Sequence, residues 1–600
     1  VAGTNFQAYN LSKFTFSTLL TQESTDIHSN LLDYITKFSP NVREIFIEKF
    51  LFIDQLKRLN EAGLLFQVFS KFVNLDLHPN NVSNLEMGYL FEELIRRFSE
   101  ISNETAGEHY TPREVITLIV SLLLLNDKDL LQSSGIIRQV YDPAAGTGGM
   151  LSISEIEMKK FNDKIRVELF GQELNPESYA ICKSDMLVSN HISENIAFGN
   201  SLTNDDAHKG KTFHYMLSNP PYGVKWEKYD NDIKEEHKEK GMEGRYGAGL
   251  PSVDDGQLLF LQHMISKMRT DENGSRIGIV MNGAPLYSGD ASSGESEIRR
   301  WIIEEDWIEA IIALPTDLFY NTEIQTYIWL LSNRKSYERK NKIQLIDASN
   351  EDFWKNMKKS LGKKRKEIPP ESNKRILDIF SSFDDQKNIN KDYSKVFDKD
   401  EFGYRKIRIE RPLKLSFTIN LEGITKLENK KIFQNLKNEE RNEILNILNS
   451  KLLQQKNWDD KDNFQKEIEI AFKDSSYILK SPMKKAFTSV FSEKNQTAKP
   501  SKDKNGSPES DTSLREYESI PFGVNWKNYF KEKVLPFVPE AWVDEDFVDK
   551  KDQKIGRIGY EINFNDYFYK FDPPRKIIEI STELKKIEKD ISNLFNEVFK

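Results

Sequence analysis

The sequence has little of three things: cysteine, long apolar runs and net positive charge. Cys182 is its one cysteine, which excludes a disulfide framework and a zinc site built from cysteines. The most apolar run, residues 115–125, is shorter than the ~20 apolar residues of a membrane helix, and Thr117 and Ser121 interrupt it. We therefore expect no membrane span, no metal site and a location in the reducing cytoplasm.

The charge balance limits how this chain could use nucleic acid. Lys and Arg number 85 against 94 Asp and Glu, so the net charge is −9. Because neutralisation of phosphates drives non-specific DNA affinity, either nucleic acid is not the substrate or a partner supplies much of the binding. With 38% hydrophobic and 11% aromatic residues, the chain can bury a sizeable core in about three or four domains.

The motif Asn219-Pro220-Pro221-Tyr222 follows the apolar stretch 213–216, which is typical of a strand. The Asn219 side-chain oxygen and the Pro220 carbonyl can accept both hydrogens of a planar amine, and the Tyr222 ring can stack on it. The two prolines stiffen the turn. The motif indicates chemistry on a planar amine; the alternative is an ordinary turn, in which Asn-Pro and Pro-Pro are common.

A glycine-rich turn lies upstream, between a predicted strand and a predicted helix. The strand 139–142 ends at Asp142, residues 143–149 are Pro-Ala-Ala-Gly-Thr-Gly-Gly, and a helical pattern covers 150–160. This order is typical of nucleotide sites, where glycines let the backbone approach a ligand closely. The spacing differs from the dinucleotide fingerprint G-x-G-x-x-G, which argues against NAD.

A helix start precedes the glycine turn, in the stretch 107–114. The pattern predicts Thr111 as N-cap, Pro112 as the first helical residue and Glu114 as the third residue after the cap. Capping alone would explain half of this motif. The same geometry also presents free N–H groups and the positive end of the helix dipole to a carboxylate, with Tyr110 beside it.

Seven strands are predicted between residues 138 and 332, which indicates an α/β fold. Four of them end in small or polar residues, and ligands bind at the carboxyl ends of strands in open α/β sheets. Glu173 follows the second strand about where an acidic side chain meets ribose hydroxyls; taken alone, it is more often a solvated charge. Asn200 follows the third strand. The predicted strands are 139–142, 167–171, 196–198, 213–216, 276–281, 308–313 and 327–331.

Three further features of the central and following regions have two interpretations each. The polar loop 223–254 could be a lid or a DNA-facing loop, although charged loops are usually solvated. Phe319, before the last strand, could enter the same pocket or pack in the core. The lysine-rich residues 355–366 could contact phosphates, but the pattern favours a solvated face.

The outer regions carry helical and linker patterns. Ser83 and Glu86 form a capping-box pattern for a helix over 83–98, the clearest part of a helical N-terminal region. Residues 493–519 have few apolar side chains, which predicts a flexible linker. The last segment carries apolar residues at alternating spacings of three and four, a coiled-coil seam that favours a partner helix. These residues are Ile577, Ile580, Leu584, Ile587, Ile591, Leu594 and Val598.

Taken together, the stretches 107–114, 142–149, 171–175 and 219–222 resemble the modification (M) subunit of type I restriction-modification systems, a gamma-class adenine-N6 DNA methyltransferase. The resemblance implies a Rossmann-like, S-adenosylmethionine-dependent methyltransferase core with a seven-stranded sheet. An N-terminal helical domain, which we expect to be trimmed at its start, would precede this core, and a mainly helical region would follow it. The expected domains are the helical domain (1–105), the methyltransferase domain (106–335), a helical, basic extension (336–492), the linker (493–519) and a C-terminal segment with the coiled-coil helix (520–600).

The same resemblance implies roles for individual residues. Asn219, Pro220, Pro221 and Tyr222 would carry methyl transfer, and Tyr222 and Phe319 would stack on an adenine that has left the duplex. Asn200 would meet the adenine of the cofactor, although family members often have Asp there. The residues implied for S-adenosylmethionine are Glu108, His109, Tyr110, Thr111, Pro112, Arg113, Asp142, Gly146, Thr147, Gly148, Gly149, Glu173 and Asn200.

The implied partners are DNA, a specificity (S) subunit bound through the helix 577–598, and a restriction (R) subunit in the full complex, with two M subunits per S subunit. No segment resembles a target-recognition domain, which fits site selection by a separate subunit. Two other functions stay open. A protein-glutamine N5 methyltransferase uses the same Asn-Pro-Pro-Tyr chemistry but is much shorter. A non-catalytic DNA-binding scaffold would not need the intact glycine turn.

Overall fold

The structure is a computed structural model in which the chain forms two compact units. The first unit comprises Val1–Ser288, Trp301–Lys399 and Glu561–Lys600, and the second comprises Gly289–Arg300 and Asp400–Tyr560. The residues that the structure describes are 8–21, 23, 25–77, 81–82, 87, 111–127, 131–133, 135–189, 191–320, 322–383, 392–453, 457–503, 505–569 and 576–598.

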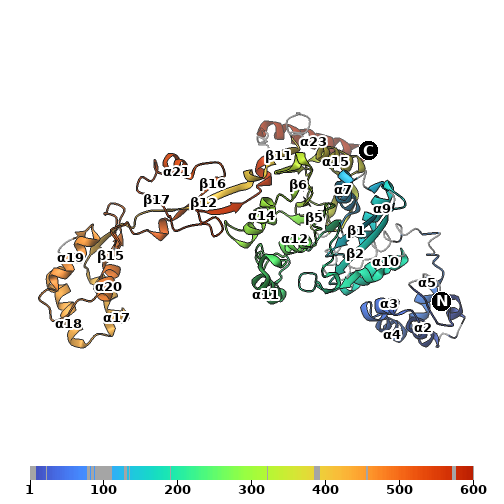
Figure 1. Ribbon diagram of the computed structural model, residues 1–600, viewed down its shortest axis with the longest axis horizontal. Helices are drawn as coiled ribbons and strands as arrows, with labels where there is room; N and C mark the ends of the chain where they lie inside the picture. The colour runs from blue at the N-terminus through green and yellow to red at the C-terminus, as the bar shows by residue number, and fades with distance from the viewer. Residues whose placement is uncertain are drawn as a thin grey trace. The chain divides into compact units, whose positions relative to one another are not determined.

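A nine-stranded sheet forms the centre of the first unit (Figure 1), in the order β11-β8-β6-β7-β5-β4-β1-β2-β3. β7 is antiparallel to β5 and β6, β11 is antiparallel to β8, and the other pairs are parallel. The strands are β1 (Ile137–Asp142), β2 (Arg166–Glu173), β3 (Ile196–Phe198), β4 (Tyr215–Ser218), β5 (Arg276–Asn282), β6 (Ile308–Ala313), β7 (Thr326–Ser332), β8 (Lys342–Asp347) and β11 (Ser394–Asp398).

All seven predicted strands are present in this sheet as β1 to β7, within one or two residues at most of their ends. They were recognisable because β4, β6 and β7 are buried along their whole length and therefore read as mostly apolar runs, with Glu309 as the one charged residue among them. The predicted number of strands is wrong, because β8 and β11 extend the sheet to nine. β11 is an edge strand with mostly half-exposed side chains, so its sequence carries little apolar signal.

Helices cover the sheet. Eight of the twelve residues of α7 are buried. α7 packs against α9, α15 and β5. Gly278 on β5 permits this close approach, since a Cβ there would lie 2.5 Å from Ile119 Cγ2. The helices of this region are α7 (Arg113–Leu124), α9 (Gly149–Phe161), α10 (Pro176–Val188), α11 (Asp230–Lys240), α12 (Gln257–Ser266), α13 (Ala284–Tyr287), α15 (Pro370–Ser382) and α22 (Phe564–Phe568), with α14 (Gly294–Glu304) divided between the units.

Short helices precede the sheet in the chain and bury an apolar core that includes Leu31 and Phe69. Glu44 joins this bundle to α10, since its carboxylate accepts hydrogen bonds from Tyr179 Oη at 2.8 Å and Lys183 Nζ at 2.7 Å. The predicted helix 83–98 lies outside the described residues. The elements are α1 (Phe16–Leu20), α2 (Ile27–Thr36), α3 (Pro40–Arg43), the π-helix η1 (Glu44–Lys49), α4 (Phe52–Glu61) and α5 (Leu65–Val73).

The second unit contains two small antiparallel sheets and a helical cluster. In one sheet β12 pairs with β16, β17 and β18, and in the other β13 pairs with β14 and β15. The strands are β12 (Gly403–Glu410), β13 (Leu415–Thr418), β14 (Asn457–Trp458), β15 (Ser492–Lys494), β16 (Glu516–Pro521), β17 (Trp542–Val543) and β18 (Arg557–Tyr560). The helices are α16 (Leu421–Glu428), α17 (Lys431–Gln434), α18 (Asn438–Ile447), α19 (Lys461–Ala471), α20 (Ser481–Phe491) and α21 (Trp526–Tyr529).

The structure differs from two expectations for the C-terminal half. The extension 336–492 contains the helices α15 to α20, as expected, but also the strands β8 to β14. The stretch 493–519 contains most of β15 and most of β16 instead of a flexible linker throughout. Its order comes from pairing with β12 and β13 and from ion pairs such as Lys461 with Glu509, at 2.6 Å. Such long-range pairings leave no mark in local composition.

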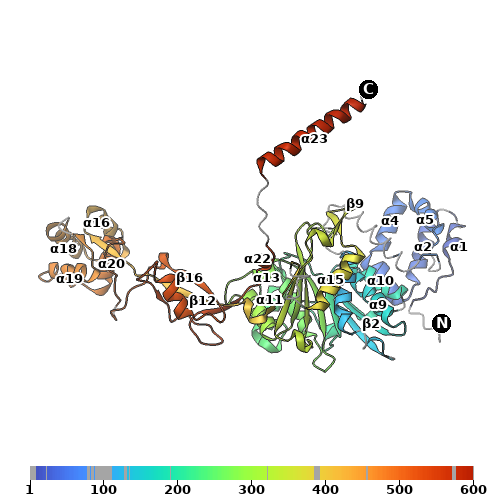
Figure 2. The same ribbon diagram turned by 90° about the horizontal axis from the view of Figure 1, so that it is seen from above.

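The first unit also contains a strand pair that is not part of the nine-stranded sheet and a long terminal helix (Figure 2). β9 (Lys355–Leu361) and β10 (Lys364–Glu367) pair as a separate antiparallel ribbon. The helix α23 (Ile577–Val598) confirms the predicted terminal helix, and its seam side chains from Ile577 to Leu594 are exposed. No helix within the described ranges is long and apolar enough to cross a membrane.

Candidate functional site

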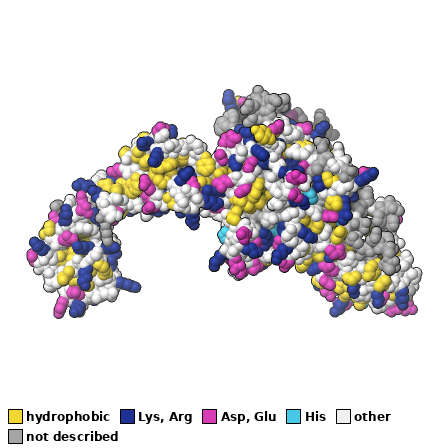
Figure 3. Space-filling model, in the orientation of Figure 1, with side chains coloured by type: hydrophobic (Ala, Val, Ile, Leu, Met, Phe, Trp, Pro, Cys, Tyr) yellow, Lys and Arg dark blue, Asp and Glu magenta, His cyan; other side chains and the backbone are white. Residues whose placement is uncertain are grey.

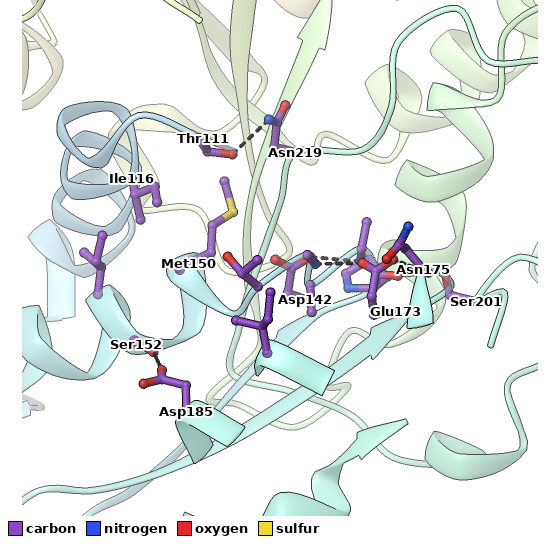
Figure 4. Close-up of a pocket in the computed structure, with 18 of the residues that line it drawn as sticks. Thr111, Ile116, Asp142, Met150, Ser152, Glu173, Asn175, Asp185, Ser201 and Asn219 are labelled. Atoms are coloured by element: carbon purple, nitrogen blue, oxygen red, sulfur yellow. Dashed lines mark hydrogen bonds between the residues drawn. The ribbon is translucent and has the colours of Figure 1, made fainter. Parts of the chain in front are cut away.

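A cavity of about 590 Å³ opens at the carboxyl ends of β1, β2, β3 and β4 (Figure 4). The start of α7 and the helices α9 and α10 complete its walls. Most of the described residues predicted for the site line this cavity. They are Thr111, Arg113, Asp142, Gly146, Thr147, Gly149, Glu173, Asn200, Asn219 and Pro221.

The other predicted site residues lie elsewhere. Pro112, Gly148, Pro220 and Tyr222 are neighbours of lining residues but are not part of the wall. Glu108, His109 and Tyr110 lie outside the described residues. Phe319 is 1% exposed and belongs to the apolar core, so its assignment to the pocket is corrected to a core position.

The glycine turn adopts a conformation that only small residues tolerate well. Gly146 and Gly148 have φ values of 54° and 89°, in the left-handed region. A Cβ on Gly148 would also lie 2.9 Å from Cys182 Sγ of α10. The turn delivers the first residue of α9, Gly149, to the cavity, so the unpaired N–H groups of this helix start face a potential anion or polar ligand.

Asp142 fixes the turn and the end of β4. Its Oδ1 accepts hydrogen bonds from Ala144 N and from Ser218 Oγ, both at 2.9 Å. The carboxyl group is 2% exposed, and burial raises the pKa of Asp142 to about 7, against the effect of these two donors. The group therefore changes charge near neutral pH while it lines the cavity.

Glu173 joins the glycine turn to the start of α10. Its Oε2 accepts a hydrogen bond from Gly146 N and its Oε1 accepts one from Asn175 N, both at 2.7 Å. Asn175 in turn caps α10 by accepting from Glu177 N and Ser178 N. A carboxylate in this position carries free lone pairs toward the cavity and holds two loops in register. The sequence-based alternative of a solvated strand-end charge is wrong, because Glu173 is buried.

The loop after β3 is held by two residues of the polar segment 223–254, Arg245 and Tyr246. Arg245 donates to the carbonyl oxygens of Ser201 at 2.7 Å and Leu202 at 3.0 Å, and it pairs with Glu236 at 2.6 Å. Tyr246, fully buried, donates to the same Leu202 carbonyl. Part of the segment 223–254 thus supports the cavity wall instead of being a solvated loop. The adjacent Arg245 and Tyr246 were the feature of the sequence that could have indicated this role.

Asn219 lies at the end of β4 with both ends of its amide engaged. Its Nδ2 donates to Thr111 Oγ1 at 2.8 Å, and its Oδ1 accepts from the Tyr222 hydroxyl. Burial raises the pKa of the Tyr222 phenol, so this hydroxyl stays protonated and remains a donor. The amide oxygen therefore faces a defined direction and keeps one lone pair for a further donor.

The predicted cap of α7 is wrong in detail. The helix begins at Arg113, Pro112 is its N-cap, and no side chain caps it. The Thr111 hydroxyl bonds Asn219 instead, and Glu114 binds Lys364 of β10 rather than closing a capping box. Both side chains serve contacts with distant parts of the chain.

Sequence reasoning also missed a polar pair deep between α9 and α10. Ser152 Oγ donates to Asp185 Oδ2 at 2.6 Å, and both residues line the cavity.

Within the described part of the chain, no group of three or more His, Cys, Asp or Glu side chains could hold a metal ion.

The fold is that of a methyltransferase. The chain is similar to the crystal structure of the type I restriction-modification system methyltransferase subunit from Streptococcus thermophilus, with a TM-score of 0.51 and 20% identity over 67% of this chain and 79% of that one. More narrowly, the chain belongs to the N-6 DNA methylase family, whose model matches residues 83–410. The resemblance inferred from the four motif stretches is confirmed.

Curated relatives agree with this family. The chain is 27% identical over 341 residues to the type I restriction enzyme MjaIX methylase subunit of Methanocaldococcus jannaschii, covering 56% of each chain. It is 31% identical over 299 residues to the MjaVII methylase subunit of the same organism, covering 49% of this chain and 47% of that one. The matched part therefore spans about half the length of these relatives.

Proposed function

We propose that this protein is the modification subunit of a type I restriction-modification system and transfers a methyl group from S-adenosylmethionine to N6 of an adenine in DNA. One observation carries the proposal: Asn219 lies at the end of β4 against the cavity, with its amide oriented by Thr111 and Tyr222. Family membership and the relatives' names support the same chemistry.

The residues around the cavity fit S-adenosylmethionine. The cavity volume of about 590 Å³ lies within the roughly 300–1,000 Å³ of ligand pockets. Asp142 and Glu173 offer carboxylates to a cationic ligand with ribose hydroxyls, and Asn200 offers an amide to an adenine edge. The turn around Gly146 brings backbone N–H groups close to the ligand.

When bound, this cofactor would supply a methyl group on a sulfonium that is already a good electrophile. The protein then needs to position a poor nucleophile, because the lone pair of the adenine amine is delocalised into its ring. Asn219 Oδ1 and the Pro220 carbonyl would accept the two amine hydrogens and favour a pyramidal nitrogen. These two acceptors would hold the nitrogen facing the donor methyl group, and one amine proton would pass to water. Catalysis is positioning and electrostatics, without a strong base.

The target adenine must leave the duplex to reach Asn219. We assign stacking on the extruded base to Tyr222, which is only partly buried, and no longer to Phe319. The Tyr222 hydroxyl bonds Asn219 Oδ1, so the ring and the amine-binding oxygen form one rigid group. An arriving amine would use the second lone pair of that oxygen or displace the hydroxyl.

The terminal helix α23 supports the proposed partner. Its seam residues Ile580, Leu584, Ile587 and Ile591 are all exposed, and burying the remaining surface of each against another helix would stabilise a complex by about 1 kcal/mol. We propose that this seam binds the specificity subunit, with two copies of this chain per specificity subunit and a restriction subunit in the full complex. These proteins would act in the cytoplasm.

The proposal is tested by the change Asn219→Ala in the full chain co-expressed with its specificity subunit. Methyl transfer to DNA should be abolished while S-adenosylmethionine still binds, because the amide contacts the base and not the donor. Asn231→Ala, on the exposed face of α11, is the matched control and should keep activity. Transfer retained by the Asn219 variant would contradict the assignment.

A second candidate, protein-glutamine N5 methylation, uses the same amine-binding motif. Methyl transfer to protein instead of DNA would favour it. A non-catalytic scaffold would bind no S-adenosylmethionine, so an equilibrium binding measurement separates it from both enzymes.

A further inference from the structure

The ribbon of β9 and β10 concentrates positive charge in an acidic protein. Residues 355–367, hereafter the basic ribbon, contain six Lys, one Arg and one Glu, whereas the whole chain has a net charge of −9. On the face drawn in Figure 3, by contrast, Lys and Arg side chains are interspersed with Asp and Glu. The basic ribbon is therefore a local exception to the charge pattern.

Four cations of the basic ribbon are available to a ligand. Lys358, Lys359, Lys363 and Arg365 are exposed, and their side chains have no hydrogen-bond or ion-pair partner among the described residues. Lys358 and Lys359 follow one another in β9, so their side chains point to opposite faces of the ribbon and present charge on both. Four cations within residues 358–365, none of them paired within the described part of the chain, are suited to a polyanion.

Lys364 anchors the basic ribbon to the first unit. This lysine is 3% exposed, and its ammonium binds Glu114, the Leu318 carbonyl at 3.0 Å and the Lys366 carbonyl at 2.9 Å. These acceptors satisfy all three of its hydrogens, as a buried ammonium requires. Backbone bonds from Lys363 N to Tyr320 O and from Arg365 N to Asp317 O add further support.

The anchor joins the basic ribbon to the helix start that serves the cavity. Glu114 lies in the first turn of α7, three residues after Thr111, which bonds Asn219. Arg113, between them, lines the cavity. The turn end of the ribbon, at Lys364, and the amine-binding amide are thus held by the same short stretch of chain.

We propose that Lys358, Lys359, Lys363 and Arg365 bind the phosphate backbone of duplex DNA beside the extruded adenine. The inference rests on the proposed function, because it takes DNA as the substrate of the cavity. Duplex DNA presents one negative charge per roughly 1.7 Å of its axis, so a cluster of cations can bind it without reading the bases. The ribbon gives an acidic chain a point of contact next to its site.

The test uses the full chain co-purified with its specificity subunit and a labelled duplex, titrated at several salt concentrations. Two double variants, Lys358→Gln with Lys359→Gln and Lys363→Gln with Arg365→Gln, each remove two cations. Each should weaken DNA binding roughly tenfold, on specific and unrelated duplexes alike, and lower the salt slope by about two. S-adenosylmethionine affinity should not change, which shows that the variants are folded.

Two comparisons make the outcome specific. Lys358→Arg with Lys359→Arg keeps both charges and should bind as the original chain does. Lys466→Gln with Lys473→Gln removes two exposed lysines elsewhere and should have little effect.

Unchanged affinity and salt slope in both ribbon variants, with intact DNA methylation, would overturn the ribbon proposal alone. Loss of the specificity subunit from the variants would make the ribbon a protein-binding surface and overturn it too. Failure of the original complex to bind or methylate DNA would overturn the proposed function as well.

Discussion

The Thr111 hydroxyl accepts a hydrogen bond of 2.8 Å from the side-chain amide of Asn219, 108 residues further along the chain. Together with the Tyr222 hydroxyl on the other end of the amide, it selects one of the two amide orientations. Thr111→Val keeps the shape and removes the acceptor, so Asn219 could rotate and present its NH₂ group to the adenine amine. We expect single-turnover methyl transfer to slow roughly tenfold to a hundredfold.

The same bond predicts which control should recover activity. Thr111→Ser retains the hydroxyl and should transfer at close to the original rate, while both variants should bind S-adenosylmethionine with similar affinity. A Val variant as fast as the original chain would show that Asn219 needs no acceptor at Thr111.

Arg245 should control cofactor affinity without contacting the cofactor. Arg245→Met removes the donors to the carbonyls of Ser201 and Leu202 and leaves Glu236 without its cation. The loop that lines the cavity after β3 should then loosen, and S-adenosylmethionine should bind about tenfold more weakly by titration calorimetry. Glu236→Gln keeps the contacts to the loop and should cost much less; an equal loss in both variants would contradict a role in holding the loop.

Asp142 should make cofactor binding depend on pH near neutrality. Burial raises its pKa to about 7, so in the free protein the fraction of carboxylate rises as the pH increases through this value. If the cationic cofactor binds the carboxylate form, affinity should increase roughly eightfold from about pH 6 to about pH 7.5. Asp142→Asn keeps an oxygen acceptor for Ala144 and Ser218 and should flatten this dependence. An equally steep profile in the Asn variant would place the titrating group elsewhere.

The seam of α23 should be needed for assembly and not for the cofactor. Leu584→Asp with Ile591→Asp places two charges in the exposed apolar stripe, and we expect co-purification with the specificity subunit to be lost. Lys585→Asp with Lys589→Asp changes neighbouring positions outside the stripe and is the matched control. Removal of residues from Pro573 onward should act like the seam variant, with S-adenosylmethionine binding intact in all cases. Normal assembly of the seam variant would refute this role.

The sequence was sufficient for the elements whose signal is local. The buried strands β4, β6 and β7 are mostly apolar runs, and the glycine turn precedes a helix, so the positions of the first seven strands along the chain followed from pattern. β11 was missed because an edge strand with half-exposed side chains has no such run. The strands within 493–519 were missed because partners far away in the chain order them.

The site divides in the same way. The strand-end positions of Asp142, Glu173, Asn200 and Asn219 were predictable, because the carboxyl ends of parallel strands meet at one edge. The partners of these side chains were not predictable. Thr111 has the residue type and spacing of a helix cap, and only the tertiary fold brings Asn219 to it. Phe319 could not be assigned to pocket or core until its burial was known.

The central claim is that this chain methylates N6 of adenine in DNA, and the most direct measurement is the identity of the methylated product. The full chain, co-expressed with its neighbouring subunit, is incubated with tritiated S-adenosylmethionine and duplex DNA, and the DNA is digested to nucleosides and separated. The account predicts tritium in N6-methyladenine, and none there with Asn219→Ala. Tritium in protein glutamine, in another base, or equally in the Asn219 variant would contradict it.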